Sequence, residues 1–252
     1  MNFFIKNSKI SFYLEYKMAG GHTVKNVSQY PYMASVLNIK SFTFCGGSII
    51  SEYYVLTAGH CLTPEYPEHH FIKSNSVHTD YGGFEREVSK AIRHEKYELL
   101  EDGVRAINDI GLVKVKEPFV FDADCQPVAF FNPREKISEN SYGSVIGWGK
   151  IDNWIYPDYL QHSELPLLSN QICNQTYLED YGGILPGQIC AGFINDDGEK
   201  NTFPGDSGSP LIVNNKILGV VTWTREPYGQ PNSPCVFTEV PKYFPWIEEN
   251  MK

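Results

Sequence analysis

The sequence of 252 residues lacks any apolar run long enough to cross a bilayer, a task that needs about 20 consecutive apolar residues in a helix. It also lacks basic clusters: 21 Lys and Arg residues stand against 30 Asp and Glu residues, a formal net charge of −9. Nucleic acids and anionic membranes recruit proteins through clustered Lys and Arg. We therefore expect neither a nucleic acid nor a membrane among its partners.

The six cysteines include no CxxC pair, the spacing typical of zinc sites, so the sequence predicts no zinc. Two short spacings, Cys45 to Cys61 and Cys173 to Cys190, suit local disulfides and therefore an oxidising compartment. Two Asn-x-Ser/Thr sequons, which begin at residues 26 and 174, are compatible with secretion.

The first residues, MNFFIKNSKISFYLEYK, lack the uninterrupted apolar core of a signal peptide, because Lys6, Asn7 and Lys9 break it. No small-residue cleavage site follows them. We expect either a signal upstream of a truncated start or export by another route.

Short β-rich runs separated by turn clusters extend along most of the chain, which is the pattern of an all-β sandwich or barrel. The runs occupy residues 32–39, 42–50, 53–58, 110–115, 144–149, 210–215 and 217–223. The only convincing helix lies in the C-terminal segment 242–252, at about 242–250. There Phe244, Ile247 and Met251 recur at helical spacing.

One serine, Ser207 in TFPGDSGSP, stands between two glycines, which alone fits an ordinary polar turn as well as a catalytic site. A serine hydroxyl becomes a good nucleophile only beside an imidazole, which a carboxylate usually orients. His60 in VLTAGHC ends a β-rich run beside Cys61. Asp109 in AINDIGLVKV precedes an apolar strand, where a carboxylate needs a partner.

The motifs CGGSII, TAGHC, NDIGLVKV, IGWG and GDSGSP occur in this order, and over about residues 18–252 the chain resembles the chymotrypsin-like (trypsin-family) serine endopeptidases. The resemblance implies two packed antiparallel β-barrels, at roughly residues 30–125 and 130–240, and then the C-terminal helix. Residues 18–252 form one peptidase domain in this interpretation, and residues 1–17 are a leader or activation peptide.

The resemblance makes Ser207 the nucleophile, His60 the general base and Asp109 the carboxylate that orients the base. The backbone N–H groups of Gly205 and Ser207 correspond to the oxyanion hole, which stabilises charge in the tetrahedral transition state. Thr222 replaces the serine that commonly approaches the acid, and its hydroxyl can still donate a hydrogen bond.

An activation site also follows from the resemblance. Lys17 precedes MAGG at the place where relatives begin their mature chain, with Met18 and Ala19 in place of the usual branched pair. Cleavage of the Lys17–Met18 bond would release the amine of Met18 to pair with Asp206. A buried ammonium is tolerated only beside an anion, so this pairing would order the oxyanion hole.

Disulfides carry over from the family unevenly. The resemblance pairs Cys45 with Cys61, beside the predicted base, and Cys173 with Cys190, beside the specificity pocket. The remaining two cysteines are expected to be buried thiols: Cys125 and Cys235.

Another bridge that is common in the family is missing at the rim of the pocket. Phe203 occupies one of its positions, and residues 224–234 contain no cysteine. The rim is then either looser or held by packing of Phe203.

The specificity pocket has a neutral floor in this interpretation, because the floor position corresponds to Asn201. An amide cannot pair with a Lys or Arg side chain, so trypsin-like cleavage is disfavoured. The other substrate-binding positions are Thr222, Trp223, Thr224 and Cys235, of which Thr224 and Cys235 add atoms where wide pockets have glycine. A narrowed pocket favours small or medium apolar residues, as in elastase-like members. A chymotrypsin-like pocket for aromatic residues or Leu is the alternative.

The segment 71–87 lacks the paired acidic loop that binds calcium in some relatives, so neither a metal nor another cofactor is expected. Three histidines in or near it are expected to be solvated loop residues rather than ligands: His69, His70 and His78.

The sequence therefore predicts a secreted, extracellular zymogen that becomes a serine endopeptidase and acts through an acyl-enzyme. We expect a monomer that meets peptide or protein substrates, an activating protease and, as further candidates, protein inhibitors. The rival hypothesis is a weakly catalytic homologue that works as a binding or regulatory module, suggested by departures at residues 18–19, 203–204, 209 and 224. An α/β-type esterase is excluded, because its nucleophile would precede the acid and the histidine.

Overall fold

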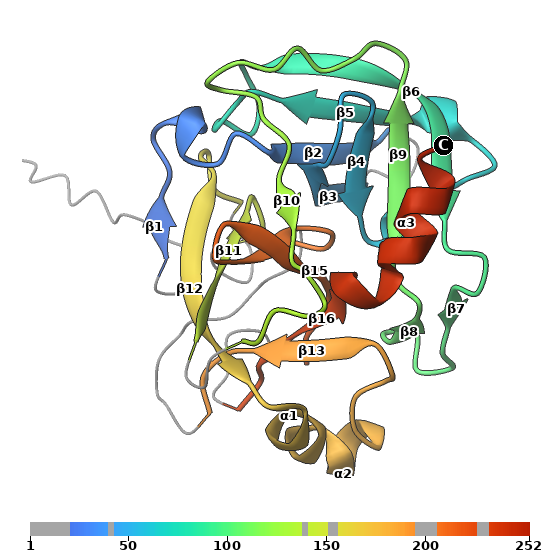
Figure 1. Ribbon diagram of the computed structural model, residues 1–252, viewed down its shortest axis with the longest axis vertical. Coiled ribbons are helices and arrows are strands. Elements are labelled where there is room, and N and C mark those ends of the chain that lie inside the picture. The colour runs from blue at the N-terminus through green and yellow to red at the C-terminus, as the bar shows by residue number, and fades with distance from the viewer. Residues whose placement is uncertain (1–20, 40–42, 138–140, 151–155, 195–205, 226–231) are drawn as a thin grey trace, which may run out of the picture.

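The computed structural model describes residues 21–39, 43–137, 141–150, 156–194, 206–225 and 232–252. Within them, two antiparallel β-barrels lie one above the other, and a helix ends the chain (Figure 1). This arrangement confirms the expected chymotrypsin-like fold. No helix in these ranges is long and apolar enough to cross a membrane.

The first barrel closes in the order β2-β3-β4-β9-β6-β5, with antiparallel pairing throughout. One apolar side chain from each of five strands is at most 1% exposed: Val36, Ile49, Leu56, Ile72 and Leu112. Burial of these side chains is the main force that closes the barrel. Its strands are β2 (Met33–Asn38), β3 (Thr43–Ile49), β4 (Tyr54–Thr57), β5 (His70–Ser74), β6 (Phe84–Arg93) and β9 (Gly111–Val115).

The second barrel runs β12-β11-β14-β15-β16-β13 and closes where β13 pairs with β12. Its strands are β11 (Tyr142–Gly147), β12 (Gln161–Leu168), β13 (Gln188–Ala191), β14 (Pro210–Val213), β15 (Lys216–Trp223) and β16 (Cys235–Glu239). Four short strands lie outside this ring: β1 (His22–Thr23) pairs with β12, β10 (Ala129–Phe130) pairs with β15, and β7 (Glu98–Leu99) forms a separate two-stranded sheet with β8 (Ala106–Ile107).

Each of the seven expected β-rich runs contains a strand, and the differences lie at the ends. The run 210–215 ends early, at Val213, because Asn214 and Asn215 have positive φ angles of 51° and 59°. Two such residues form the tight turn that right-twisted hairpins favour, and asparagine tolerates this conformation better than most residues.

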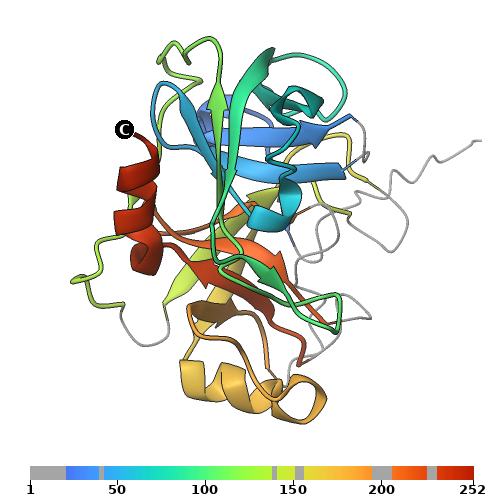
Figure 2. The same cartoon turned by 90° about the vertical axis from the view of Figure 1, so that its right-hand side faces the viewer.

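The helices differ from the expectation. The C-terminal helix α3 (Phe244–Asn250) begins two residues later than expected, because a 3-10 turn (Val240–Tyr243) precedes it and Pro245 lies in its first turn. Two helices were not expected at all: α1 (Asn170–Thr176), capped by Ser169, and α2 (Leu178–Tyr181). They lie at one end of the second barrel, away from α3 (Figure 2).

Candidate active site

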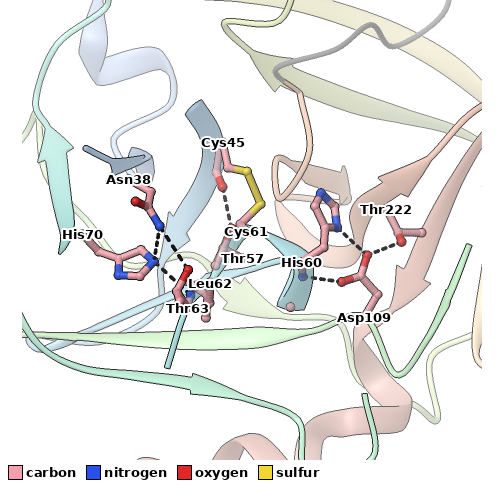
Figure 3. Close-up of a disulfide and its surroundings, with 12 residues drawn as sticks. Asn38, Cys45, Thr57, His60, Cys61, Leu62, Thr63, His70, Asp109 and Thr222 are labelled. Atoms are coloured by element: carbon pink, nitrogen blue, oxygen red, sulfur yellow. Dashed lines mark hydrogen bonds and ion pairs between the residues drawn. A yellow bond between two sulfur atoms is a disulfide. The ribbon is translucent and has the colours of Figure 1, made fainter. Parts of the chain in front are cut away.

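His60 and Asp109 meet where two paired strands of the first barrel end. His60 lies in the 3-10 turn Gly59–Cys61 that follows β4, and Asp109 lies just before β9. The pairing of Thr57 with Gly111 brings the two strand ends together. The ring Nδ1 of His60 lies 2.7 Å from Oδ2 of Asp109, and its backbone N–H donates to Oδ1 at 2.8 Å (Figure 3).

The carboxylate of Asp109 is buried, and both of its oxygens accept hydrogen bonds. It is 2% exposed, and Oδ2 also accepts a hydrogen bond from Oγ1 of Thr222, which comes from β15 of the other barrel (Figure 3). Burial alone would raise the pKa of Asp109, but the charge of His60 and the hydrogen bonds from His60 and Thr222 lower it below the usual value. Asp109 is therefore held as a carboxylate.

The pKa of His60 moves in the opposite direction. Burial alone would lower it, but the charge of Asp109 and the hydrogen bond to Asp109 raise it above the ordinary value. The ring of His60 keeps 30% of its surface exposed, so its second nitrogen can be reached from outside the barrel. This is the arrangement that general-base chemistry requires.

The turn that carries Ser207 is bonded to both barrels. The carbonyl of Ser207 accepts from the N–H of Gly46 in β3 at 2.8 Å, and the N–H of Gly208 donates to the carbonyl of Val221 in β15 at 2.9 Å. Within the turn, the N–H of Ser209 donates to the carbonyl of Asp206 at 2.8 Å. The backbone position of Ser207 is thus fixed from two sides.

Gly208 allows this turn to approach the segment before His60. Its φ of +82° lies in the left-handed region, and a Cβ there would overlap the hydroxyl of Thr57 and the carbonyl of Gly46. The same Cβ would lie 3.2 Å from the backbone nitrogen of Ala58. The turn that carries Ser207 therefore packs against Ala58, which lies two residues before His60 in the sequence. In the described ranges, no hydrogen bond joins Ser207 Oγ to His60, and catalytic hydrogen bonds are commonly long before substrate binds.

A disulfide links the support of Ser207 to the turn of His60. Cys45 in β3 is bonded to Cys61, with 6.3 Å between their Cα atoms, beside His60 (Figure 3). The neighbour of Cys45 is Gly46, whose N–H holds the Ser207 carbonyl. The crosslink therefore limits relative movement of the two predicted catalytic groups.

A family model described as Trypsin matches residues 18–247 of the chain. The chain belongs to the trypsin family. It is 35% identical over 242 residues to the anionic trypsin of Bos taurus, a match that covers 93% of this chain and 90% of that protein. It is 33% identical over 236 residues to trypsin 5G1 of Aedes aegypti, covering 92% and 84%. Its family and these relatives identify the chain as a serine endopeptidase.

A solved structure supports the same conclusion. Mouse neuropsin, described as a serine protease expressed in the limbic system of the brain, matches with a TM-score of 0.80 at 25% identity. The match covers 92% of this chain and 99% of that chain.

Asp206, the predicted partner of a new N-terminus in this trypsin-family chain, is fully buried. Its Oδ1 accepts from the N–H of Gly149 at 2.9 Å. A Cβ on Gly147 or Gly149 would overlap the carboxylate, so both positions must lack a side chain to admit it. The proposed activation bond, Lys17–Met18, lies outside the described residues.

Ser209, which stands where the family commonly has glycine, is also fully buried. Its hydroxyl has no hydrogen-bond partner within the described ranges and lies against Gly46, where a Cβ would overlap it. The extra side chain is therefore accommodated by a glycine on the facing strand.

The predicted pocket residues lie where β15 ends and β16 begins. Trp223 closes β15 opposite Val236, Thr224 follows it, and Cys235 opens β16. Thr222, by contrast, points its hydroxyl at Asp109. The predicted floor, Asn201, the oxyanion-hole Gly205 and the rim residue Phe203 lie outside the described residues.

Aromatic side chains that sequence reasoning missed lie against Trp223. The rings of Tyr177 and Tyr181 lie 4.8 and 5.2 Å from its ring, centroid to centroid. The disulfide between Cys173 of α1 and Cys190 of β13 holds their helices beside the barrel. The four-residue spacing of the two tyrosines was the available signal, since it places them on one helical face. The two remaining cysteines, Cys125 and Cys235, are buried and outside the disulfides, as expected.

The expectation that His70 is a solvated loop residue was wrong. His70 is fully buried at the start of β5. Its Nδ1 lies 3.2 Å from the carbonyl of Tyr66. Its Nε2 lies 3.1 Å from the backbone nitrogen of Thr63 and 3.2 Å from Nδ2 of Asn38 (Figure 3). A neutral ring that donates from Nδ1 satisfies all three partners. Burial lowers the pKa of His70, in agreement with a neutral ring that anchors the chain after Cys61.

One group of three possible metal ligands occurs among the described residues: Cys45, His60 and Cys61. The two sulfur atoms are bonded to each other, so they are not available as thiolate ligands.

Proposed function

We propose that this serine endopeptidase cuts peptide bonds with Ser207 as nucleophile, His60 as general base and Asp109 as the group that orients the base. The observation that carries the assignment is the pair of hydrogen bonds between His60 and Asp109, beside a Ser207 turn that is hydrogen-bonded to both barrels. Because Nδ1 of His60 is committed to Asp109, Nε2 is the nitrogen left to take a proton.

The reaction follows from these positions. Ser207 Oγ bonds to the carbonyl carbon of the substrate while its proton passes to Nε2 of His60. The N–H groups of Gly205 and Ser207 stabilise the negative oxygen that results. Collapse breaks the C–N bond, and His60 returns the proton to the leaving amine. Water, activated by His60, then hydrolyses the acyl-enzyme, and Asp109 remains a carboxylate throughout.

We propose that the enzyme is made as a zymogen and activated at Lys17–Met18. The buried carboxylate of Asp206 supports this assignment, because a buried anion beside Gly149 offers a partner to an incoming ammonium. The two disulfides support passage through an oxidising compartment and therefore secretion.

We propose a preference for small apolar residues or, alternatively, for aromatic residues and Leu, before the cut bond. Several relatives are named trypsins, but the neutral Asn201 cannot form the ion pair that a Lys or Arg side chain requires. Thr224 and Cys235 are both buried and occupy space at the proposed walls.

Active-site labelling tests the proposal. The protein is treated with a fluorophosphonate probe before and after limited cleavage at Lys17–Met18, alongside Ser207→Ala. Ser163→Ala, which removes a buried hydroxyl in β12, is the matched control. We expect labelling only after cleavage, in wild type and in Ser163→Ala but not in Ser207→Ala. A correctly cut, folded protein that does not label would favour the binding-module hypothesis.

A further inference from the structure

The two segments that flank the proposed pocket are not joined by the β-ladder. The last paired residues of β15 and β16 are Trp223 and Val236, so residues 224–225 and 232–234 extend beyond the ladder. Among the residues that the structure describes, side chains connect the two segments. One connection is weak: the Thr224 hydroxyl donates to the Ser233 carbonyl at 3.4 Å.

Arg225 makes the stronger connections. Its Nη2 donates to the carbonyl of Asn232 at 2.7 Å, and its Nε donates to Oγ of Ser233 at 3.2 Å. Its Nη1 forms an ion pair with Oδ2 of Asp180 in α2. A planar guanidinium presents its donors in a fixed fork, so one side chain can fix three groups in one geometry.

The surroundings limit how far this group can move. The guanidinium carbon lies 5.6 Å from the ring centre of Tyr177, whose hydroxyl donates to the carbonyl of Pro234. Tyr177 is fully buried and packs on Trp223. The helix that carries Asp180 and both sides of the proposed pocket are therefore connected through Arg225 and Tyr177.

We propose that Arg225 is a positioning residue that sets the width of the substrate pocket, with Asp180 as its counter-ion. The proposal rests on the proposed function, because it takes Trp223, Thr224 and Cys235 as the pocket walls. It adds a third possibility to the two expectations for the missing rim disulfide, a looser rim or packing of Phe203: a polar crosslink formed by the fork of Arg225 holds the rim. The guanidinium acts on the substrate only through the walls it holds.

The three bonds of Arg225 differ in their exposure to solvent. The side chain of Arg225 is 24% exposed and that of Asp180 is 51% exposed, so salt screens this ion pair. The bonds to Asn232 and Ser233 lie on the partly buried side. Loss of Asp180 should therefore matter less than loss of Arg225.

The test compares Arg225→Gln, Arg225→Lys and Asp180→Asn in the activated enzyme. Two readouts are taken: the rate of fluorophosphonate labelling, and kcat and KM for peptides with Ala, Leu, Phe or Lys before the cut bond. Arg86→Lys is the matched control, because Arg86 is a partly buried arginine that bonds Ser74 in the first barrel.

We expect Arg225→Gln to label within about twofold of wild type, while its preference between Ala and Phe peptides shifts about tenfold, mainly through KM. Arg225→Lys should shift in the same direction by less, and Asp180→Asn by less again. Added guanidinium ion, at concentrations too low to unfold the protein, should partly restore the preference of Arg225→Gln. Arg86→Lys should leave the preference unchanged.

The outcomes separate the two proposals. If activated wild type does not label, the proposed function fails and the positioning role falls with it. If wild type labels but Arg225→Gln keeps its preference, or loses labelling and every peptide equally, the positioning role is overturned while the proposed function stands. If Arg225→Gln does not fold, Arg225→Lys decides by the same readouts.

Discussion

His60 makes two hydrogen bonds to Asp109, one through its ring Nδ1 at 2.7 Å and one through its own backbone N–H at 2.8 Å. The backbone bond fixes the position of the Asp109 carboxylate relative to the turn, and the ring bond then fixes the tautomer and the tilt of the imidazole. Thr222 closes the remaining side of the carboxylate from the second barrel. The orientation of His60 thus depends on both barrels.

Replacement of Asp109 by Asn should lower kcat by about 10⁴-fold with little change in KM, because an amide stabilises the wrong tautomer of His60. Steady-state kinetics on the activated enzyme measure this effect. Asp124→Asn, at an exposed carboxylate of the first barrel, should behave like wild type. A loss of less than about tenfold in Asp109→Asn would remove Asp109 from the assigned role.

The pH dependence of kcat/KM should follow His60. The base must be neutral to act, and Asp109 raises its pKa, so activity should fall as the pH drops through a value above that of an ordinary histidine. In Asp109→Asn the negative charge that raises the pKa of His60 is removed. The acid limb of the residual activity should therefore move to a lower pH. An acid limb that stays in place in this variant would contradict the assignment.

Gly208→Ala should impair both stability and catalysis. Alanine would have to adopt a left-handed backbone conformation there, and its Cβ would overlap Thr57 and Gly46. This overlap displaces the Ser207 turn. Gly182→Ala is the matched control, because Gly182 also has a positive φ, 71°, but no atom lies within 4 Å of its added Cβ. We expect a cost of about 1 kcal/mol in the control and more, with loss of labelling, in Gly208→Ala, measured by urea unfolding. Equal costs and full labelling in both would contradict the account.

The free energy of unfolding should depend on pH through His70. Its pKa is lowered in the folded state, so the unfolded chain binds a proton more readily as the pH falls. Stability should therefore decrease as the pH falls from the ordinary pKa of histidine toward the lowered one. His70→Gln should cost about 1–3 kcal/mol at neutral pH through lost hydrogen bonds, and should reduce the slope with pH.

His69→Gln is the control for His70. It is the adjacent histidine, it lies outside the strand and it is only half-buried. Urea titrations between pH 7 and pH 5 measure the slope for wild type and for both variants. An unchanged slope in His70→Gln would show that another group carries the acid sensitivity.

The fold and the pairing of His60 with Asp109 could be predicted because the ordered motifs resemble those of a known family, and the resemblance implies both. A strand end followed by a histidine, and an acid before an apolar run, are visible in TAGHC and NDIGLVKV. The helices α1 and α2 were missed because they are short and Cys173 is the one buried residue in α1, so the four-residue spacing of Tyr177 and Tyr181 was their main apolar signal. The burial of His70 was hidden because Asn38, one of its three partners, lies 32 residues away in sequence and meets it only where β2 pairs with β5.

Arg225 shows the same limit more sharply. Its counter-ion Asp180 lies 45 residues away in sequence and its other partners lie seven and eight residues further on, so no spacing rule connects them. The assignments of Lys17, Met18, Asn201 and Gly205 lie outside the described residues and stay predictions.

The central claim is that an acyl group forms on Ser207 during catalysis. The activated enzyme can be mixed rapidly with a nitrophenyl ester, quenched in acid and mapped by peptide mass spectrometry. The account predicts a burst of nitrophenol that approaches one equivalent per active site and an acyl adduct on Ser207, with neither in Ser207→Ala. Hydrolysis without an adduct, or an adduct at another residue, would contradict it.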